Sequence, residues 1–263
     1  MSITKILTAA MLAALLFSEA ASAETILLDK TTRLTPQGWT AIDADDIKFK
    51  KNTSVTLNET GQVVKGVLSS NTYLRPRGFK SLANDHFYVE GVNDFFPVRF
   101  FRPFLHRHGV VLPAYGHVRY KADSTVVFAE DGTVLEGSID HEVILQIQPD
   151  RYGFVRFKSG GVLSFYPSGA VKAGLLDKDT LLRPVGWERN LAAGNAGYME
   201  FKSGSYISFT EEGLVNQGAP KQDTPWKNSD GVFATLTAKI SYLYSGSGAE
   251  PAAVQPEIAA VNS

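Results

Sequence analysis

Three histidines near the middle of the chain have a spacing that could hold a metal ion. His106 and His108 lie two residues apart, so on a strand they would face the same side, and His117 or His86 could complete the set. We therefore take His106, His108 and His117 as candidate metal ligands. No acidic residue that would orient these rings is evident in the sequence, so the alternative is that they face solvent or are hydrogen-bonded. No other residue pattern predicts a cofactor.

The segment before these histidines has the composition of a binding surface. Residues 95–104 contain five of the 16 phenylalanines of the chain, interleaved with two arginines. The candidate partner-binding residues are Phe95, Phe96, Arg99, Phe100, Phe101 and Arg102. Stacking and cation–π contacts from such a surface would suit an envelope protein, a glycan or a lipid headgroup. A second interpretation stays open, in which the rings fill the core of an irregular connecting segment.

The motifs of common catalytic sites are absent from the sequence. The chain contains no Gly-x-Ser-x-Gly frame, no Walker loop, no Gly-x-Gly-x-x-Gly and no His-Glu-x-x-His. Because there is no cysteine, disulfides, thiolate metal sites and cysteine nucleophiles are excluded. We predict no catalytic residue. An envelope hydrolase or a metal-binding protein that uses His and Asp residues around segment 80–117 is the alternative.

The charge balance limits the partners of the chain. Its 26 Lys and Arg residues face 27 Asp and Glu residues, a formal net charge of −1. A general nucleic-acid binder needs a surplus of cations, so nucleic acid is not an expected partner. No window after the first 23 residues holds 18 consecutive apolar residues, so no transmembrane helix is expected. The sequence predicts nothing about the oligomeric state.

The first 23 residues have the three parts of a secretory signal. Lys5 gives a positive start, residues 6–17 are uncharged and mostly apolar, and Ala21-Ser22-Ala23 is a small-x-small cleavage site. We expect export to a bacterial periplasm, to the cell surface or to the medium.

Four segments of the chain align without gaps around a central glycine. They are residues 55–66, 126–137, 163–174 and 207–218, centred on Gly61, Gly132, Gly169 and Gly213. In each, a large apolar residue stands four before the central glycine, a valine two after it, and a second glycine five after it.

This pattern predicts β-hairpins. The alternation of apolar and polar residues buries one face of each strand, and the central glycine suits a type I turn with a glycine bulge, where φ is positive. We expect the second glycine to end the return strand or to let another backbone approach closely. The predicted fold is therefore all-β, with tandem β-hairpin repeats stacked into an extended or solenoid-like antiparallel sheet.

A second element recurs beside the hairpins, a Leu-x-Pro run that leads through a glycine to a large aromatic residue. It occurs at residues 34–39, 74–79 and 182–187. In the last two copies the residue before proline is an arginine, Arg75 or Arg183. We expect this arginine to stack on the aromatic residue or to bind a turn carbonyl. A row of Arg and Trp ligand sites across the array is the functional alternative.

The hairpin pattern resembles the MORN-variant repeats of bacterial exported and antitoxin-like proteins. Residues 165–172, Phe-Tyr-Pro-Ser-Gly-Ala-Val-Lys, are similar to the core motif of that family, and the resemblance extends over residues 118–226, with a weaker copy at 47–79. It implies a stacked β architecture and a binding role, and it carries over no catalytic residue.

These patterns give a predicted organisation of the whole chain. It consists of a signal peptide (1–23), an N-terminal β-repeat region (24–79), an aromatic and histidine-rich insert (80–117), β-hairpin repeats (118–230), one capping strand (231–244) and a disordered tail (245–263). The expected function is a non-enzymatic binding or structural role in the cell envelope. Since the alternating stretch 232–244 also resembles an outer-membrane barrel strand, an outer-membrane-associated β protein is a further alternative.

Overall fold

The structure, a computed structural model, describes residues 23–39, 47–77, 117–148, 153–188, 196–245 and 250–254. Within these ranges the regular structure is almost entirely β, and the predicted all-β fold of tandem hairpins is confirmed. No helix in the same ranges is long and apolar enough to cross a membrane.

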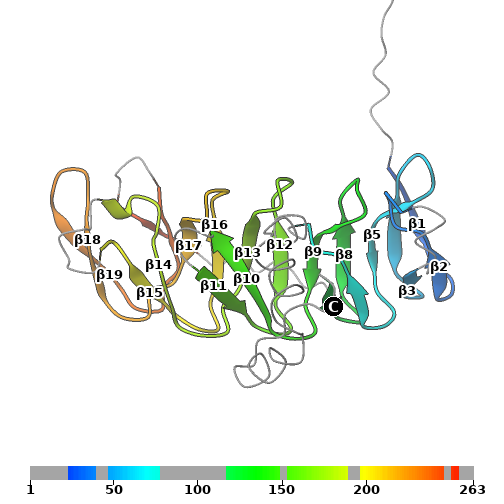
Figure 1. The fold of residues 1–263 in the computed structure, drawn as a ribbon, viewed down its shortest axis with the longest axis horizontal. Coiled ribbons are helices and arrows are strands. Elements are labelled where there is room, and N and C mark those ends of the chain that lie inside the picture. Colours follow the sequence, from blue (N-terminus) through cyan, green and yellow to red (C-terminus); the bar gives the residue numbers. More distant parts are fainter. Residues whose placement is uncertain are drawn as a thin grey trace, which may run out of the picture.

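In the described part of the chain, 11 strands form one long antiparallel sheet, the main sheet (Figure 1). In spatial order they are β1 (Glu24–Leu27), β4 (Ser54–Leu57), β5 (Val63–Val67), β8 (Thr125–Phe128), β9 (Val134–Ser138), β12 (Val162–Phe165), β13 (Val171–Leu175), β16 (Tyr206–Phe209), β17 (Val215–Gly218), β20 (Tyr242–Leu243) and β21 (Ala252–Ala253). Along the chain, each pair of neighbouring strands in this sheet alternates with a two-stranded ribbon of a second layer.

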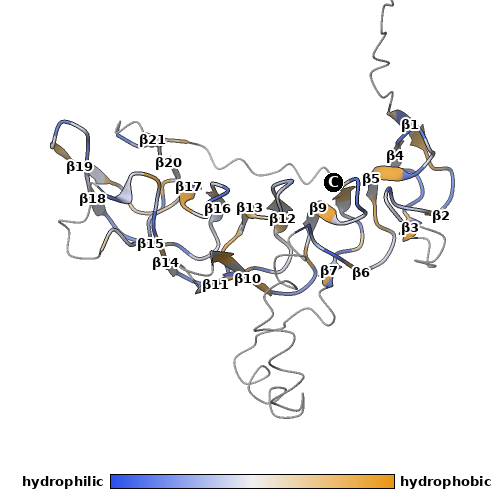
Figure 2. Cartoon of the chain, turned by 45° about the horizontal axis from the view of Figure 1, so that its top comes forward, coloured by the Kyte–Doolittle hydropathy of each residue, from blue (hydrophilic) through white to orange (hydrophobic). Residues whose placement is uncertain are grey.

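The described ribbons lie on one face of the main sheet (Figure 2). They are β2 (Thr32–Leu34) with β3 (Ile47–Phe49), β6 (Thr72–Leu74) with β7 (Val118–Tyr120), β10 (Val143–Gln148) with β11 (Gly153–Phe157), β14 (Thr180–Leu182) with β15 (Met199–Phe201), and β18 (Thr224–Lys227) with β19 (Phe233–Leu236). We call a ribbon and the main-sheet strand pair that follows it one unit. The first unit is β2–β5 and the fifth is β18–β21.

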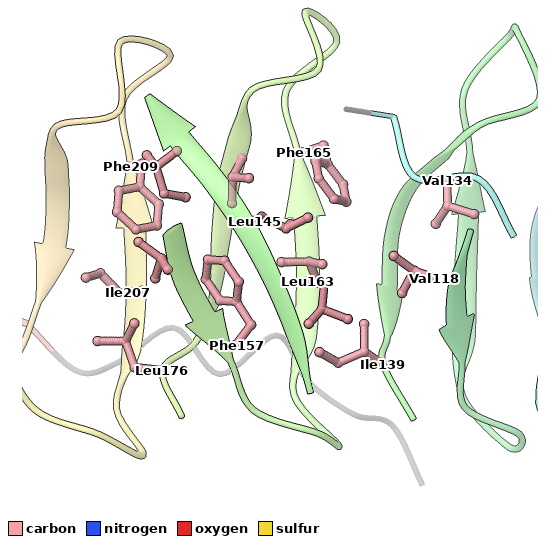
Figure 3. Close-up of a cluster of buried hydrophobic side chains, with 14 of the residues drawn as sticks. Val118, Val134, Ile139, Leu145, Phe157, Leu163, Phe165, Leu176, Ile207 and Phe209 are labelled. Atoms are coloured by element: carbon pink, nitrogen blue, oxygen red, sulfur yellow. The ribbon is translucent and has the colours of Figure 1, made fainter. Parts of the chain in front are cut away.

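The hydrophobic core lies between the main sheet and the ribbons (Figure 3). Leu145 and Phe157 come from the third ribbon, and Leu163 and Phe209 come from the main sheet. The rings of Phe157 and Phe209 meet edge to face, with centroids 6.5 Å apart. Because alternate residues of each strand point into this layer, the period of two in the sequence becomes one continuous core.

The four predicted glycine turns are confirmed. Their central glycines have φ between 76° and 97°. In each turn, the glycine N–H donates to the carbonyl of the residue three positions before it. The N–H of that same residue donates to the carbonyl of the residue that follows the glycine. A bulge interrupts the strand register beside the turn. This is a type I turn with a glycine bulge. Gly231 makes the same turn between β18 and β19, which the sequence pattern had not indicated.

The second glycine of each repeat has a different role from the one expected. At Gly174, an added Cβ would lie 2.4 Å from Cδ1 of Phe157, a ring of the preceding ribbon. The same contact joins Gly66 to Phe49, Gly137 to Tyr120 and Gly218 to Phe201. This glycine therefore makes room for an aromatic ring of the second layer, not for a backbone.

The C-terminal end departs from the prediction of one capping strand over 231–244. The structure divides this stretch into β19, which belongs to a ribbon, and β20, which belongs to the main sheet. Between them Lys239 has φ 66° and the chain turns. Beyond it, β21 pairs with β20, so residues 252–253 are ordered inside the segment that was expected to be a disordered tail.

Neighbouring units are joined along the edge of the main sheet that carries the glycine turns, which we call the turn edge. From the first unit, Nε1 of Trp39 donates to the carbonyl of Gly132 at 3.0 Å. Nε of Arg77 donates to the carbonyl of Pro167 at 2.7 Å, and its guanidinium also pairs with Asp131. Side chains of one unit thus bind the turn of the next.

Candidate functional site

Most of the residues predicted to form a site lie outside the described residues. These are Phe95, Phe96, Arg99, Phe100, Phe101, Arg102, His106 and His108. His117 is described, immediately before β7, and is half-buried. Among the described residues no group of three or more His, Asp and Glu side chains could hold a metal ion. The insert surface and the three-histidine site remain predictions.

A pocket lies between the fourth and fifth ribbons of the second layer. Its volume is about 300 Å³. The fourth unit contributes Leu181 of β14, Pro184, and residues 197–200, which lead into and through the start of β15. The fifth unit contributes residues 222–226, from the loop before β18 and from β18 itself. The pocket therefore exists only because two units lie side by side.

The pocket combines an apolar wall with polar groups. Leu181, Pro184, Met199, Pro225 and Trp226 form the apolar part, whereas Tyr198, Glu200, Gln222, Asp223 and Thr224 bring hydroxyl, amide and carboxylate groups. Apolar walls with a few placed polar groups are typical of small-ligand sites.

A cation between two aromatic rings supports one side of the pocket. The guanidinium carbon of Arg183 lies 3.9 Å from the ring centroid of Trp187 and 4.4 Å from that of Tyr198. Nε of Arg183 also donates to the carbonyl of Ala196 at 3.1 Å. The predicted stacking of this arginine on the aromatic residue of its motif is confirmed. The stack orients Tyr198, which lines the pocket.

Lys221 orients Glu200 at the pocket rim. Its Nζ lies 3.0 Å from Glu200 and 3.1 Å from Asp179. These two carboxylates, Glu200 foremost, raise the pKa of Lys221. The pKa of Asp179 is lowered to about 2. The largest cause is a hydrogen bond from the backbone N–H of Ser203, and the second is the hydrogen bond from Lys221. Asp179 is thus charged at neutral pH, and Lys221 holds both carboxylates in place.

The fifth unit adds an acceptor and a donor at the rim. Oδ1 of Asp223 accepts the N–H of Ala238 at 2.8 Å, and the structure shows no bond to its other oxygen within the described residues. The Gln222 side chain is exposed, and the same residues offer it no hydrogen-bond partner. A carboxylate oxygen and an amide are therefore available to a ligand.

No local sequence signal indicates this pocket. Leu181 directly precedes the recurring Leu-x-Pro element of residues 182–187, and its side chain is 59% exposed. Tyr73, at the same place in β6, is 56% exposed. Pro225, the pocket residue from the neighbouring ribbon, lies in β18. Periodicity could place each residue on the outer part of a ribbon, but not show that two ribbons leave a hollow between them.

Comparison of the chain with known protein families, curated proteins and solved structures finds no match.

Proposed function

We propose that the chain is an exported, non-enzymatic β-repeat protein that binds a glycan of the cell envelope through the pocket between its last two ribbons. The observation that carries this proposal is the composition of the pocket, in which Tyr198 and an apolar wall face carboxylate and amide groups. Export is inferred from the signal-like residues 1–23. The resemblance to MORN-variant repeats agrees with a binding role.

Size and chemistry favour a sugar over a larger ligand. A volume of about 300 Å³ is at the lower end of ligand pockets and suits one sugar ring better than a cofactor. The carboxylates of Glu200 and Asp223 can accept hydrogen bonds from sugar hydroxyls, and charged acceptors make the stronger bonds. The aromatic face of Tyr198 and the side chain of Leu181 can cover the apolar face of the ring.

Leu181 can be used to test glycan binding in the pocket, because its exposed side chain can be removed without creating a cavity in the core. We expect Leu181→Ala to weaken binding of a neutral oligosaccharide about tenfold, the loss expected for a few buried carbons. Tyr73→Ala is the matched control, since Tyr73 has the same place in β6 and does not line this pocket. Titration of the mature chain with N-acetylglucosamine and glucose oligosaccharides, followed by tryptophan fluorescence, measures both.

The two variants together decide the outcome. Weaker binding by Leu181→Ala with unchanged binding by Tyr73→Ala supports the pocket. Equal affinities of wild type and Leu181→Ala for every oligosaccharide, or saturable binding of neutral peptides alone, would overturn the proposal.

A further inference from the structure

One lysine recurs at the same structural position in four consecutive units. Lys50, Lys121, Lys158 and Lys202 each directly follow the inward aromatic residue that packs on the repeat glycine. They lie at the start of the turns that lead from a ribbon to the main sheet, on the edge opposite the glycine turns. We call this the loop edge.

The backbone holds these lysines in equivalent places. The N–H of each donates to a carbonyl at the end of a main-sheet return strand, at 2.8 Å for Lys50, Lys121 and Lys158 and at 3.0 Å for Lys202. The carbonyls of Lys50, Lys121 and Lys202 accept the hydroxyl of Thr53, Ser124 and Ser205 respectively. Because successive units advance by two main-sheet strands, neighbouring lysines are spaced by about 10 Å.

Within the described parts of the chain, the first of the four lysines alone has a counter-ion. Nζ of Lys50 lies 2.8 Å from Asp123, the residue with positive φ in the turn of the next unit. The turns of the third and fourth units carry Gly160 and Gly204 at that position, and the fifth carries Lys239. Among the described residues, Lys121, Lys158 and Lys202 therefore have no ion-pair partner.

Two acids of the loop edge are paired with basic side chains of the protein. Asp140 pairs with Arg119 at 3.3 Å, and Asp179 pairs with Lys221. By contrast, the glycine turns on the opposite edge carry acids and no base: Glu59, Glu130, Asp131, Glu211, Glu212 and Asp230. The recurring lysines and these turn acids thus lie on opposite edges of the main sheet, although the net charge is only −1.

We propose that Lys121, Lys158 and Lys202 form a row that binds a linear acidic polysaccharide along the loop edge. A straight series of cations with a fixed spacing suits a chain that carries carboxylates at intervals, and such contacts gain free energy by releasing counterions. The turn residues beside the row, Ser159 with Gly160 and Ser203 with Gly204, are small and polar. They leave room for a sugar chain and offer no apolar side chain for insertion into a bilayer.

This row is separate from the pocket, and the inference does not depend on the proposed function of that pocket. The pocket test uses neutral oligosaccharides, whereas the row is tested with polygalacturonate oligomers of defined length. Each proposal can therefore fail while the other holds.

Restoring the missing carboxylates is the sharpest test. At Gly160 and Gly204 no atom lies within 4 Å of an added Cβ, and Asp123 shows that aspartate adopts this backbone conformation, with φ 59°. In Gly160→Asp/Gly204→Asp we expect the new carboxylates to pair with Lys121 and Lys158 and to reduce polygalacturonate affinity at least about tenfold at low salt. Asp123→Gly should free Lys50 and strengthen binding.

A charge-matched pair of triple variants separates the row from a general charge effect. Lys121→Gln/Lys158→Gln/Lys202→Gln should lower the slope of log affinity against log salt by about two to three, since each contact contributes about 0.7 to 1. The control Lys48→Gln/Lys65→Gln/Lys172→Gln removes the same charge from exposed positions on β3, β5 and β13 and should change affinity little.

Isothermal titration at several salt concentrations gives these values, with a neutral glucan, a single-stranded oligonucleotide and phosphatidylglycerol vesicles as further probes. Equal losses in the two triple variants would overturn the row. So would unchanged affinity in Gly160→Asp/Gly204→Asp. Binding of the oligonucleotide or vesicles as tight as that of polygalacturonate would overturn the assignment to a polysaccharide.

Discussion

Gly174→Ala is expected to lower the free energy of unfolding by about 1–3 kcal/mol, the usual cost of overpacking a core. An added Cβ would lie 2.4 Å from Phe157 and 3.3 Å from Leu163, and Phe157 is 1% exposed, so neither side chain can move away easily. Gly174 has no positive φ, so without the ring this substitution would stabilise the strand by about 0.4–1 kcal/mol. A loss of unfolding free energy therefore indicates that the Phe157 ring packs on Gly174, and a gain indicates that it does not. Urea denaturation followed by far-UV circular dichroism measures it.

Shortening Phe157, the side chain that the added methyl group would meet, provides the control. Phe157→Leu alone leaves a cavity, but in the double variant Gly174→Ala/Phe157→Leu the methyl group enters the space left by the ring. We expect the double variant to be less destabilised than the sum of the two single changes, because the residues are in contact. Additive losses, or a stabilising Gly174→Ala, would show that the ring does not pack on this glycine.

Gly132→Ala is expected to lower the free energy of unfolding by about 3 kcal/mol. Roughly 1–2 kcal/mol comes from the left-handed backbone conformation and the rest from overpacking against Trp39. Gly132 has φ 80°, and an added Cβ would lie 2.4 Å from Cδ1 of Trp39 in the preceding unit. Gly61 makes the same turn with φ 76°, and no atom lies within 4 Å of its added Cβ. Gly61→Ala should therefore show the backbone cost alone. Thermal and urea unfolding of the two variants compare them directly.

The difference between these two variants measures how strongly neighbouring units interlock. In a Trp39→Leu background, the cost of Gly132→Ala should fall toward that of Gly61→Ala, because the ring that meets the methyl group is gone and the carbonyl oxygen of Gln37 lies farther away, at 3.2 Å. If Gly132→Ala and Gly61→Ala cost the same in the wild-type background, the first and second units do not interlock at this turn.

The parts of the fold that depend on a few consecutive residues could be predicted from the sequence. The glycine turns follow from local alternation and from the conformational freedom of Gly61, Gly132, Gly169 and Gly213, which all have positive φ. The stack of Arg183 on Trp187 follows from a short recurring motif. Both are contacts within one unit, so the signal and the structure lie in the same segment.

Features that depend on tertiary contacts could not be predicted in this way. The alternation of residues 232–244 is consistent with one long strand, but Leu236, in the fifth ribbon, is buried while Val232 and Ile240 are exposed. The chain turns at Lys239 because it changes layers there, and periodicity does not record layers. Likewise the partner of Gly174 is a ring from the preceding ribbon, which the glycine spacing cannot identify.

The two candidate sites differ in how much of them is visible in the sequence. The lysines of the row recur in Phe-Lys-Ser-Gly at residues 157–160 and 201–204, but their lack of a counter-ion becomes clear only when Asp123 is seen to pair with Lys50 of the preceding unit. The pocket requires Leu181 and Pro225 to come from adjacent ribbons. Its residues are ordinary members of their own repeats.

Both the pocket and the lysine row require that the units are stacked in series with the register described. Since the chain has no cysteine, engineered cysteine pairs can be read without interference. Lys65 faces Val127 across β5 and β8, and Glu136 faces Ser164 across β9 and β12. Cα atoms at directly opposite positions lie about 4.5–5.5 Å apart, within the range of a disulfide.

Mild oxidation of the chain carrying each cysteine pair, followed by non-reducing electrophoresis and mass spectrometry, tests this register. We expect intramolecular disulfides in Lys65→Cys/Val127→Cys and in Glu136→Cys/Ser164→Cys, and none in Lys65→Cys/Ser164→Cys. Failure of both matched pairs, together with ready bridging of the mismatched pair, would contradict this register.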